Sequence, residues 1–526
     1  MKRKTQNHNR IHEFLIKELE TFVIRHKLTI KESDKNAGIC VMKTTDYNAE
    51  IIRQLSDETI YRPSTNSEYL MKMEEFTDKV RYLSNWLFKD LKIKRIMPIN
   101  HSPAKFYILP KIHKKFVSFP VGRPISSTKK SINKGIAMLL DTALQVLSFH
   151  IPDLLIDSPH LLLLLEHLEL DPNRKYILVT ADISAMYLEL PIHICKQNCI
   201  KFFRENANKI NFPFPINEAQ LKILLDLCLD YSFLEFENNI HFQHKGIQMG
   251  NSASVSIANI TAAVELENLK SEFVKFLRRF IDDIFMIVDI TDLETSIPEW
   301  LDSFFKHNFL KFTYEYSERQ ISFLDLNINL DENNKISTSI YRKPMSKHEF
   351  LHFSSNHPKH LLKSLPYSSG LRVIRSCSDN ETKNKELELL MSKFSLRGYP
   401  NTILKPIKQR LDSIIRSDIL IPKSKLLIHH LSLHNPEILS HYNRTTPNLI
   451  TPSNGVYIVF PFCNNIHGMG KLTKTMFLQE LIYRNHNTLR KCILDLNVNI
   501  AFSIPNSINR FIHCVNANHR KQVLNE

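Results

Sequence analysis

Two spacings of apolar residues run along this chain, and each predicts a kind of secondary structure. Apolar side chains that recur three and four positions apart predict helices that pack along one face. This helical spacing is found in residues 11–27, 45–56, 68–93, 131–170, 257–266 and 294–307, and across most of 346–450. Helices are therefore expected along much of the chain, with strands confined to the segments between them.

Short apolar runs and alternating apolar and polar residues predict the strands. A basic segment over 104–128 is rich in strand-forming residues and is expected to form a hairpin. Residues 233–243 alternate around Asn238-Asn239, a pair that suits a hairpin turn. Residues 311–316 and 323–328 alternate in the same way. The strand signals thus come mainly as antiparallel pairs.

The strand-like segment 277–288 is unusual because it contains two adjacent carboxylates, Asp282 and Asp283. Burying carboxylates in an apolar run is costly unless something pairs with them. Aspartate is also a turn residue, so a surface turn explains the pair equally simply. The alternative is a hairpin whose turn holds both acids against a divalent cation.

Two other segments favour the cation. The apolar run 176–181 delivers a single acid, Asp182, at its end, and the glycine-containing loop 246–250 opens a helix between the two acidic positions. Ser252 is expected to cap that helix. The chain therefore has an acid at a strand end, then a glycine loop, then an Asp-Asp hairpin.

This order resembles the palm motifs of template-directed polymerases, and of reverse transcriptases in particular. Further short motifs make the chain similar to the Penelope-like retroelement branch, with specific matches from about residue 30 to about residue 360. These motifs are Asp34-Lys35-Asn36, Leu109-Pro110-Lys111-Ile112-His113-Lys114, Gly122-Arg123-Pro124-Ile125, Phe323-Leu324-Asp325-Leu326, Tyr341-Arg342-Lys343-Pro344 and His352-Phe353-Ser354-Ser355-Asn356-His357-Pro358.

The resemblance implies an α+β fold of the right-hand polymerase type, with fingers, a palm built on an antiparallel sheet, and a helical thumb. The expected divisions are an N-terminal extension over 1–95, fingers over 96–180, a palm with its primer-grip hairpin over 181–345, a thumb over 346–450, and a small C-terminal unit over 451–526.

The resemblance also implies the catalytic group. Asp182 and Asp282 are expected as the main ligands of two Mg²⁺ ions and Asp283 as the supporting ligand, with Mn²⁺ as an alternative metal. Two such ions activate a 3′-hydroxyl and stabilise a pyrophosphate leaving group. Three acids suffice because Mg²⁺ takes further ligands from substrate phosphates and water.

Five residues are expected to bind the nucleotide. Lys111 and Arg123, at the base of the basic hairpin, suit a triphosphate. Tyr187 is expected beneath the sugar, where its ring would collide with a ribose 2′-hydroxyl, although core packing explains the same residue. Met249 and Gly250 belong to the glycine loop, where Gly250 allows a base pair to approach the backbone.

The primer grip is expected at Phe323, Leu324 and Asp325, in the hairpin that the resemblance assigns to this role. Asp325 stands in an apolar run and could be mistaken for a further metal ligand. Its position, later than the other acids, favours a structural role.

The net charge of the chain adds only modest support for a nucleic-acid partner. The chain has 69 Lys and Arg against 54 Asp and Glu, a formal net charge of +15. This suits a polyanionic partner, but a generally basic protein explains it as well. The partners that the resemblance implies are an RNA template, a DNA primer or RNA–DNA hybrid, and dNTPs, and the sequence does not define an oligomeric state.

The implied activity is that of an RNA-directed DNA polymerase, a nucleotidyltransferase of a retroelement. Two alternatives stay open at this point. One is a catalytically inactive or host-adopted nucleic-acid-binding relative, and the other is an RNA-synthesising polymerase. Tyr187 is the residue that distinguishes the last alternative.

Three other patterns are expected to carry no separate function. His193, Cys195 and Cys199 invite a zinc site, but no second ligand pair follows at finger-like spacing, so structural cysteines are expected. Gly455-Val456-Tyr457-Ile458 resembles the start of a GIY-YIG nuclease, but the other elements of that motif do not follow. The leucine run that ends at Glu166 is too short to span a bilayer.

Polar residues rather than an apolar core follow Met1-Lys2-Arg3-Lys4. We therefore expect an intracellular protein without a membrane partner, and the resemblance points to the nucleus.

Overall fold

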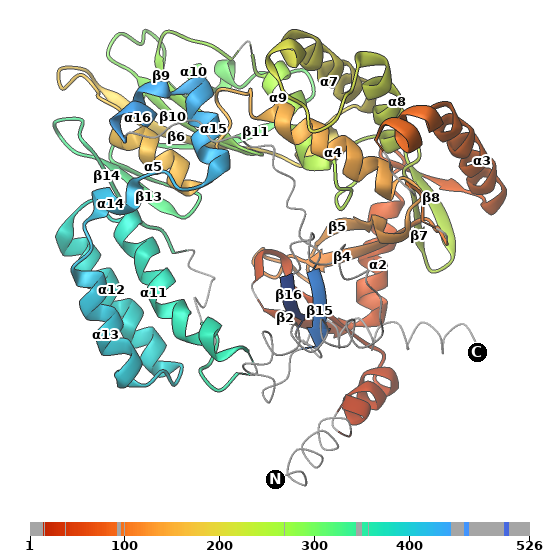
Figure 1. Ribbon diagram of the computed structural model, residues 1–526, viewed down its shortest axis with the longest axis horizontal. Helices are drawn as coiled ribbons and strands as arrows, with labels where there is room; N and C mark the ends of the chain where they lie inside the picture. The colour runs from red at the N-terminus through yellow and green to blue at the C-terminus, as the bar shows by residue number, and fades with distance from the viewer. Residues whose placement is uncertain are drawn as a thin grey trace, which may run out of the picture.

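The computed structural model combines helices with mainly antiparallel sheets, which confirms the α+β class (Figure 1). It describes residues 14, 16–36, 38–91, 96–98, 100–267, 269–342, 350–355, 357–442, 457–461 and 499–503. Most of the expected C-terminal unit, including Gly455 and Val456, lies outside these residues.

The central sheet has four strands in the order β11-β6-β10-β9, all antiparallel to their neighbours. Their bounds are β6 (Tyr176–Ile183), β9 (Val274–Phe280), β10 (Asp283–Asp289) and β11 (Phe312–Ser317). Strand residues alternate between the two faces of this sheet. Ile177 and Val179 therefore belong to one hydrophobic core, and Tyr176 and Leu178 to another.

A second sheet has five strands in the order β3-β8-β7-β4-β5. Its strands are β3 (Tyr61–Ser64), β4 (Ala104–Pro110), β5 (Gly122–Ser127), β7 (Phe233–Phe236) and β8 (Asn239–Gln243). Both predicted hairpins are confirmed, and Glu237 and Asn238 take the positive φ values of the tight turn between β7 and β8. The sheet joins strands from three of the expected divisions, whose boundaries stay predictions.

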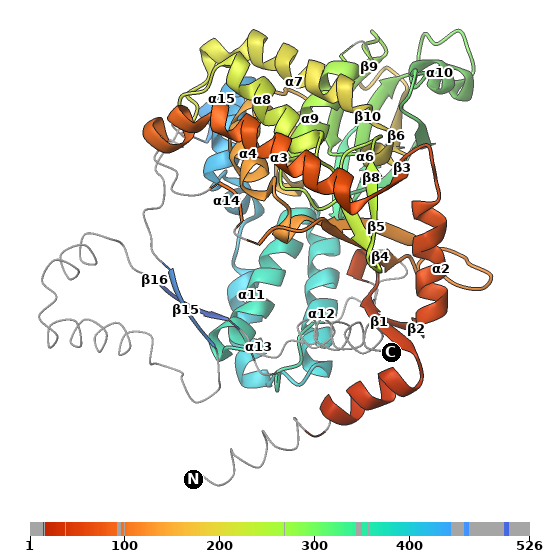
Figure 2. The ribbon, with the colours of Figure 1, turned by 90° about the vertical axis from the view of Figure 1, so that its right-hand side faces the viewer.

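Helices cover the first face of the central sheet (Figure 2). They are α3 (Asn66–Tyr82), α4 (Lys134–Ser148), α7 (Ile192–Asn206), α8 (Glu218–Leu229), α9 (Ser254–Glu265) and α10 (Ile297–Phe304). Helix α2 (Thr44–Leu55) packs on the second sheet, and α5 (Ser158–Glu166) packs on the other face of the central sheet. The single helix expected over 68–93 is wrong in its length. It ends at Tyr82, and a π-helical segment follows in which buried Trp86 donates its indole N–H to Pro215 O at 2.9 Å.

The region expected as a thumb divides into two packing units. Helices α11 (Lys359–Ser376), α12 (Asn380–Leu396) and α13 (Asn401–Asp412) share a hydrophobic core of their own and lie together apart from the central sheet (Figure 1). The chain then returns through α14 (Arg416–Leu420) to α15 (Lys425–His434) and α16 (Pro436–His441). These last two helices pack into the second core of the central sheet, together with α5.

Smaller elements complete the described chain. A hairpin of β12 (Gln320–Phe323) and β13 (Leu326–Leu330) pairs onward with β14 (Ile336–Ile340). Strands β1 (Leu28–Glu32) and β2 (Ile39–Lys43) flank a short 3₁₀ turn, η1 (Asp34–Asn36). Strands β15 (Tyr457–Pro461) and β16 (Asn499–Ser503) form a parallel pair.

The cysteine and membrane expectations can be compared with the described residues. Cys195 and Cys199 are fully buried in α7, where burial raises the pKa of both thiols, that of Cys195 to about 12. They are packed as structural cysteines. No described helix has the length and apolar character needed to cross a membrane.

Candidate active site

Three aspartates meet at one end of the central sheet. Asp182 on β6 is directly opposite Asp283 on β10 in the antiparallel register, so their side chains leave the sheet on the same face. Asp282 occupies the turn before β10, and its carbonyl accepts a hydrogen bond from Ile183 N at 3.0 Å. Ile281 takes φ of 58° to make this turn. The sheet thus brings together the acids that the sequence singles out.

The surroundings of Asp182 make this carboxyl harder to ionise. Partial burial, followed by the negative charge of Asp282, raises the pKa of Asp182 above its usual value. Lys35, Lys114 and Arg123 act in the opposite direction without cancelling the effect. Within the described part of the chain, none of the ion pairs includes Asp182 or Asp282. A bound cation would relieve this repulsion.

The donor chemistry suits a hard cation but does not form a complete cage. Carboxylate oxygens are the ligands that Mg²⁺ prefers. Among the residues that the structure describes, however, no group of three or more His, Cys, Asp and Glu side chains is arranged to hold a metal by itself. Asp182, Asp282 and Asp283 therefore fit Mg²⁺ only as a partial ligand set that substrate oxygens and water complete.

A basic cluster lies close to these acids, formed by Lys35 of η1, Lys111 and Lys114 after β4, and Arg123 of β5. Burial lowers the pKa of Lys111, and the positive charges of Lys114 and Arg123 lower it further. Their effect on the pKa of Asp182 places three of the four within electrostatic reach of the acids. Crowded cations next to carboxylates provide a site for an anion that also carries a metal.

Arg123 is partly committed to a protein partner. Its Nε lies 2.8 Å from Oδ1 of Asp34, and its Nη2 donates to Oδ2 at 3.3 Å. Asp34 is only 4% exposed, so the pair fixes η1 against β5. Next to it, Lys35 has φ of 58°, which costs a non-glycine residue about 1–2 kcal/mol. The neighbouring Asp34–Arg123 pair helps to hold this strained turn in place.

The chain after Asp182 bends sharply and brings Tyr187 back towards the acids. Ala185 has φ of 49°, and the short helix α6 (Met186–Glu189) begins directly after it. Burial raises the pKa of Tyr187 to about 12, with a further contribution from Asp282, whereas Arg123 lowers it. The half-buried Tyr187 therefore lies within electrostatic reach of both Asp282 and Arg123.

The glycine loop is docked between Tyr187 and strand β5. A Cβ on Gly246 would stand 2.6 Å from Tyr187 O, and one on Gly250, where φ is 120°, would stand 2.4 Å from Ser126 O. Met249 O accepts from Ser126 N at 2.7 Å. The close approach that Gly250 permits is thus to the protein backbone of β5, which fixes the loop between α6 and the second sheet.

The predicted cap of α9 is wrong. Ala253 precedes the helix without a side-chain cap, and Ser252 Oγ instead accepts a hydrogen bond from Lys134 Nζ at 2.7 Å. Asn251 Oδ1 accepts from Ala253 N at 3.1 Å and orders the loop before the helix. The hydrogen bond from Lys134 links the glycine loop to the first residue of α4.

The primer-grip residues lie at the turn between β12 and β13, and most of their side chains face the protein. Phe323 is 4% exposed and its ring centroid lies 5.5 Å from that of Phe285 on β10. Asp325 accepts from Arg372 Nε of α11 at 2.9 Å and from the hydroxyl of Ser158 on α5. These contacts fit the structural role expected for Asp325. Leu324, with φ of 54°, forms the turn itself.

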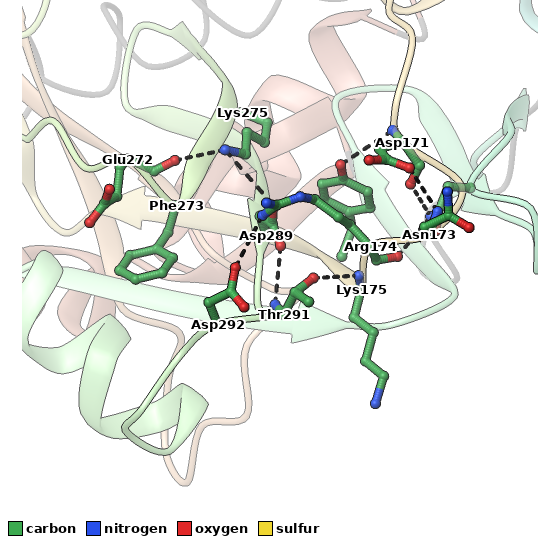
Figure 3. A network of polar contacts seen from close by, with 12 residues as sticks. Asp171, Asn173, Arg174, Lys175, Glu272, Phe273, Lys275, Asp289, Thr291 and Asp292 are labelled. Atoms are coloured by element: carbon green, nitrogen blue, oxygen red, sulfur yellow. Dashed lines mark hydrogen bonds and ion pairs between the residues drawn. The ribbon is translucent and has the colours of Figure 1, made fainter.

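A different polar network closes the opposite end of β6 and β10 (Figure 3). Asp289 is 1% exposed, and its carboxylate accepts from Arg174 Nη1 at 2.7 Å and from Thr291 N at 3.1 Å. Lys275 Nζ lies 3.8 Å from the same carboxylate, and Arg174 also reaches Asp292 at 3.3 Å. This acid is fully engaged by protein groups.

Two of the nearby cations were given no role by the sequence. Lys35 and Lys114 both stand in the short motifs that carry the resemblance, in Asp34-Lys35-Asn36 and at the end of the Leu109–Lys114 motif. Their presence near Asp182 depends on how η1 and the β4–β5 hairpin meet the central sheet. The motifs were the available sequence signal, but a motif does not indicate how far its residues lie from Asp182 in the fold.

Comparison with known proteins gives one partial family match. Residues 350–409, which span α11, α12 and most of α13, match the model of the animal helix-turn-helix domain. None of the curated proteins compared with the chain matches it.

Several solved structures are distantly similar. The telomerase of Candida albicans, in complex with a TWJ fragment of telomeric RNA, is 11% identical over 80% of this chain and 68% of that chain, with a TM-score of 0.47. The corresponding Candida tropicalis complex is 12% identical over 80% and 71%, with a TM-score of 0.43. The RNA-dependent RNA polymerase of a human picobirnavirus is 9% identical over 83% and 90%, with a TM-score of 0.37. These likenesses are too distant to carry an argument about activity.

Proposed function

We propose that the chain is an RNA-directed DNA polymerase that adds deoxynucleotides to the 3′ end of a primer by two-metal nucleotidyl transfer. The observation that carries the proposal is the group of Asp182, Asp282 and Asp283 at one end of the central sheet, next to the basic cluster. In this proposal the central sheet is the palm, the five-stranded sheet belongs to the fingers, and α11 to α13 form the thumb.

The acids are proposed to hold two Mg²⁺ ions, with Asp182 and Asp282 as the main ligands, Asp283 as the supporting ligand and Mn²⁺ as an alternative metal. When bound, such ions supply a more nucleophilic 3′-hydroxyl and a stabilised pyrophosphate. The raised pKa of Asp182 supports this assignment, because a carboxylate crowded by another gains most from a cation.

The basic cluster is proposed to bind the triphosphate. Lys111 is held where burial and other cations lower its pKa, so an arriving anion restores a favourable environment for its charge. Lys35 and Lys114 add charge from two separate segments, while Arg123 keeps its pair with Asp34. Holding the triphosphate in this way aligns the α-phosphate with the primer end, and such positioning accounts for a large part of catalysis.

Tyr187 is proposed to select deoxynucleotides. The bend at Ala185 and the influence of Asp282 on the phenol support a ring close to the sugar of a nucleotide held at the acids. A ribose 2′-hydroxyl would then meet a steric clash, which is stronger discrimination than a lost contact.

Nucleic-acid partners are proposed to be an RNA template and a DNA primer or RNA–DNA hybrid. Lys359 and Lys363 of α11 are exposed, and exposed lysines give phosphate contacts that do not depend on sequence. The helix-turn-helix match over the same helices supports a nucleic-acid-binding role for this unit. The proposed place of action is the nucleus.

Primer extension with purified protein tests the function. Radiolabelled primers annealed to RNA or to DNA templates are supplied with Mg²⁺ and either dNTPs or rNTPs. The proposal expects extension on RNA templates with dNTPs. Extension with rNTPs alone would replace the proposal with an RNA-synthesising polymerase, and binding without extension would replace it with an inactive nucleic-acid-binding protein.

A further inference from the structure

Arg279, on β9 next to the Asp-Asp turn, is the largest fully buried side chain among the described residues, with 0% exposure. Arginine is almost never fully buried unless it is paired, because removing its charge from water is costly. Replacing buried charged groups with apolar residues is often neutral or stabilising, so stability alone does not account for an arginine here.

The contacts of its guanidinium converge on two elements of the candidate active site. Nη1 donates to Ile281 O at 2.9 Å and to Asn259 Oδ1 at 3.2 Å, and Nη2 donates to Asn259 O at 2.9 Å. Ile281 is the left-handed residue directly before Asp282. Asn259 belongs to α9, the helix that the glycine loop opens.

The backbone of Arg279 is held as firmly as its side chain. Its N–H donates to Asp153 O at 2.8 Å, and its carbonyl accepts from Leu155 N at 2.7 Å. Nε lies 3.7 Å from Asp153 Oδ2, which supplies the nearest negative charge. The residue therefore connects the segment before α5, helix α9 and the turn of the catalytic hairpin.

We propose that Arg279 is a positioning residue that fixes the Ile281–Asp282 turn, so that the Asp282 carboxylate is held facing Asp182 for metal binding. The inference rests on the proposed function and deepens it by naming what sets the geometry of the acids. A strained turn needs an external constraint to persist, and the bond from Nη1 to Ile281 O provides it.

Only arginine offers donors in a planar fork that can reach a turn carbonyl and two acceptors of a helix at once. A lysine keeps the positive charge but bonds from a single nitrogen, so it cannot reproduce this geometry. Arg279→Lys is therefore the informative variant, since it separates the geometry of the fork from the charge.

Arg278→Lys is the matched control. Arg278 is the neighbouring arginine of the same strand, but its Nη1 donates to Leu277 O at 2.7 Å and its guanidinium lies 4.8 Å from the Phe276 ring centroid. Its hydrogen bond and its ring contact thus stay on β9 and do not reach the Ile281–Asp282 turn. Asn259→Ala is a second variant that removes one acceptor and leaves the arginine in place.

The experiment measures three quantities on the full chain: kcat and KM for dNTP in primer extension, Mn²⁺ affinity by electron paramagnetic resonance, and hydrogen exchange of amides in 280–284. For Arg279→Lys we expect kcat to fall about 10- to 100-fold with a smaller change in KM, Mn²⁺ to bind about tenfold more weakly, and the turn amides to exchange faster. Asn259→Ala should shift all three in the same direction by less, and Arg278→Lys should match the wild type.

Each outcome decides between the two proposals. If Arg279→Lys extends primers, binds Mn²⁺ and protects its turn like the wild type, Arg279 is only a packing residue and the inference fails while the proposed function stands. If wild-type protein does not extend primers at all, the proposed function fails, and faster turn exchange in Arg279→Lys but not in Arg278→Lys still supports the positioning role. If Arg279→Lys does not fold, Asn259→Ala gives the same decision.

Discussion

The two ends of the β6–β10 strand pair hold acids in opposite electrostatic states. At the Asp289 end, burial alone would raise the pKa of the carboxyl, but hydrogen bonds from Thr291 and the ion pair with Arg174 outweigh it and lower the pKa (Figure 3). At the Asp182 end, burial and the charge of Asp282 raise the pKa, and the nearby cations do not reverse the shift.

The opposite pKa shifts distinguish the acid that stabilises the fold, Asp289, from the acid that is available to a ligand, Asp182. Both acids lie on adjacent strands of one sheet, so their secondary structure does not distinguish them. Asp289 has its charge compensated within the protein and contributes to stability. Asp182 keeps an uncompensated charge that a cation can neutralise, and perturbed carboxyl groups of this kind are common at functional sites.

Of three variants that sharpen this comparison, the one with the largest expected effect concerns the choice of sugar at the Asp182 end. Tyr187→Ala removes the ring that is proposed to exclude a ribose 2′-hydroxyl. We expect the ratio of kcat/KM for dNTP to that for rNTP to fall by about 100-fold, since a clash is removed rather than a single contact. Steady-state incorporation of matched dNTP and rNTP measures this ratio, with Tyr187→Phe as the control that keeps the ring. An unchanged ratio in Tyr187→Ala would make Tyr187 a core residue.

The next effect separates stability from ligand binding. Asp289→Asn replaces one buried acceptor oxygen of this carboxylate with an NH₂ donor that has no acceptor there, and we expect the free energy of unfolding to fall by about 1–3 kcal/mol. Asp182→Asn removes a repulsion, so we expect no loss of stability. Urea unfolding of the two variants and the wild type measures both. A stability loss in Asp182→Asn as large as that in Asp289→Asn would mean that the two ends do not differ in the way described.

The smallest expected effect is the response of the two ends to acid. The pKa of Asp289 is lowered, so its contribution to stability is present above the usual pKa of 3.8 and is lost as the pH falls below it. The pKa of Asp182 is raised, so its charge opposes folding above that raised value, and the penalty is relieved as the pH falls through it. Stability should therefore depend less steeply on pH below about 4 in Asp289→Asn than in the wild type.

Two buried histidines set the background for that measurement. Burial lowers the pKa of His160 to about 2 and that of His430 to about 3, and their rings pack 4.9 Å apart between α5 and α15. Both are neutral in the fold, so stability is present above their usual pKa of 6.5 and is lost progressively below it. This loss is common to all three proteins, and only the difference between them below pH 4 tests the comparison. Identical slopes in Asp289→Asn and the wild type would contradict it.

Sequence patterns predicted the elements that the site depends on, because each is defined by local spacing. The hairpins at 104–128 and 233–243 and the strand that ends near Asp182 follow from alternation and turn residues, and the structure contains all of them. The juxtaposition of Asp182 with Asp283 came from the resemblance, since a strand register over 100 residues apart leaves no local trace.

The remaining features depend on tertiary contacts that no short pattern encodes. Serine is a common helix-capping residue, but the hydroxyl of Ser252 accepts a hydrogen bond from Lys134 of α4 instead. Phe323 belongs to an expected primer grip, but its ring packs on Phe285. Arg279 stands in a strand among other basic residues, and only the packed structure distinguishes it from Arg278. In each case a partner distant in sequence decided what the side chain contacts.

The most direct test of the account is single-nucleotide primer extension under single-turnover conditions, with Mg²⁺ titrated over wild-type protein, Asp282→Asn and Asp292→Asn. Asp292 is an exposed acid at the opposite end of the same sheet and serves as the matched control. The account predicts that Asp282→Asn abolishes extension at every Mg²⁺ concentration while binding the primer–template as the wild type does, because the lost charge acts on the metal rather than on the duplex. Asp292→Asn should extend normally, and extension by Asp282→Asn at the wild-type rate would contradict the assignment of the three acids as the catalytic group.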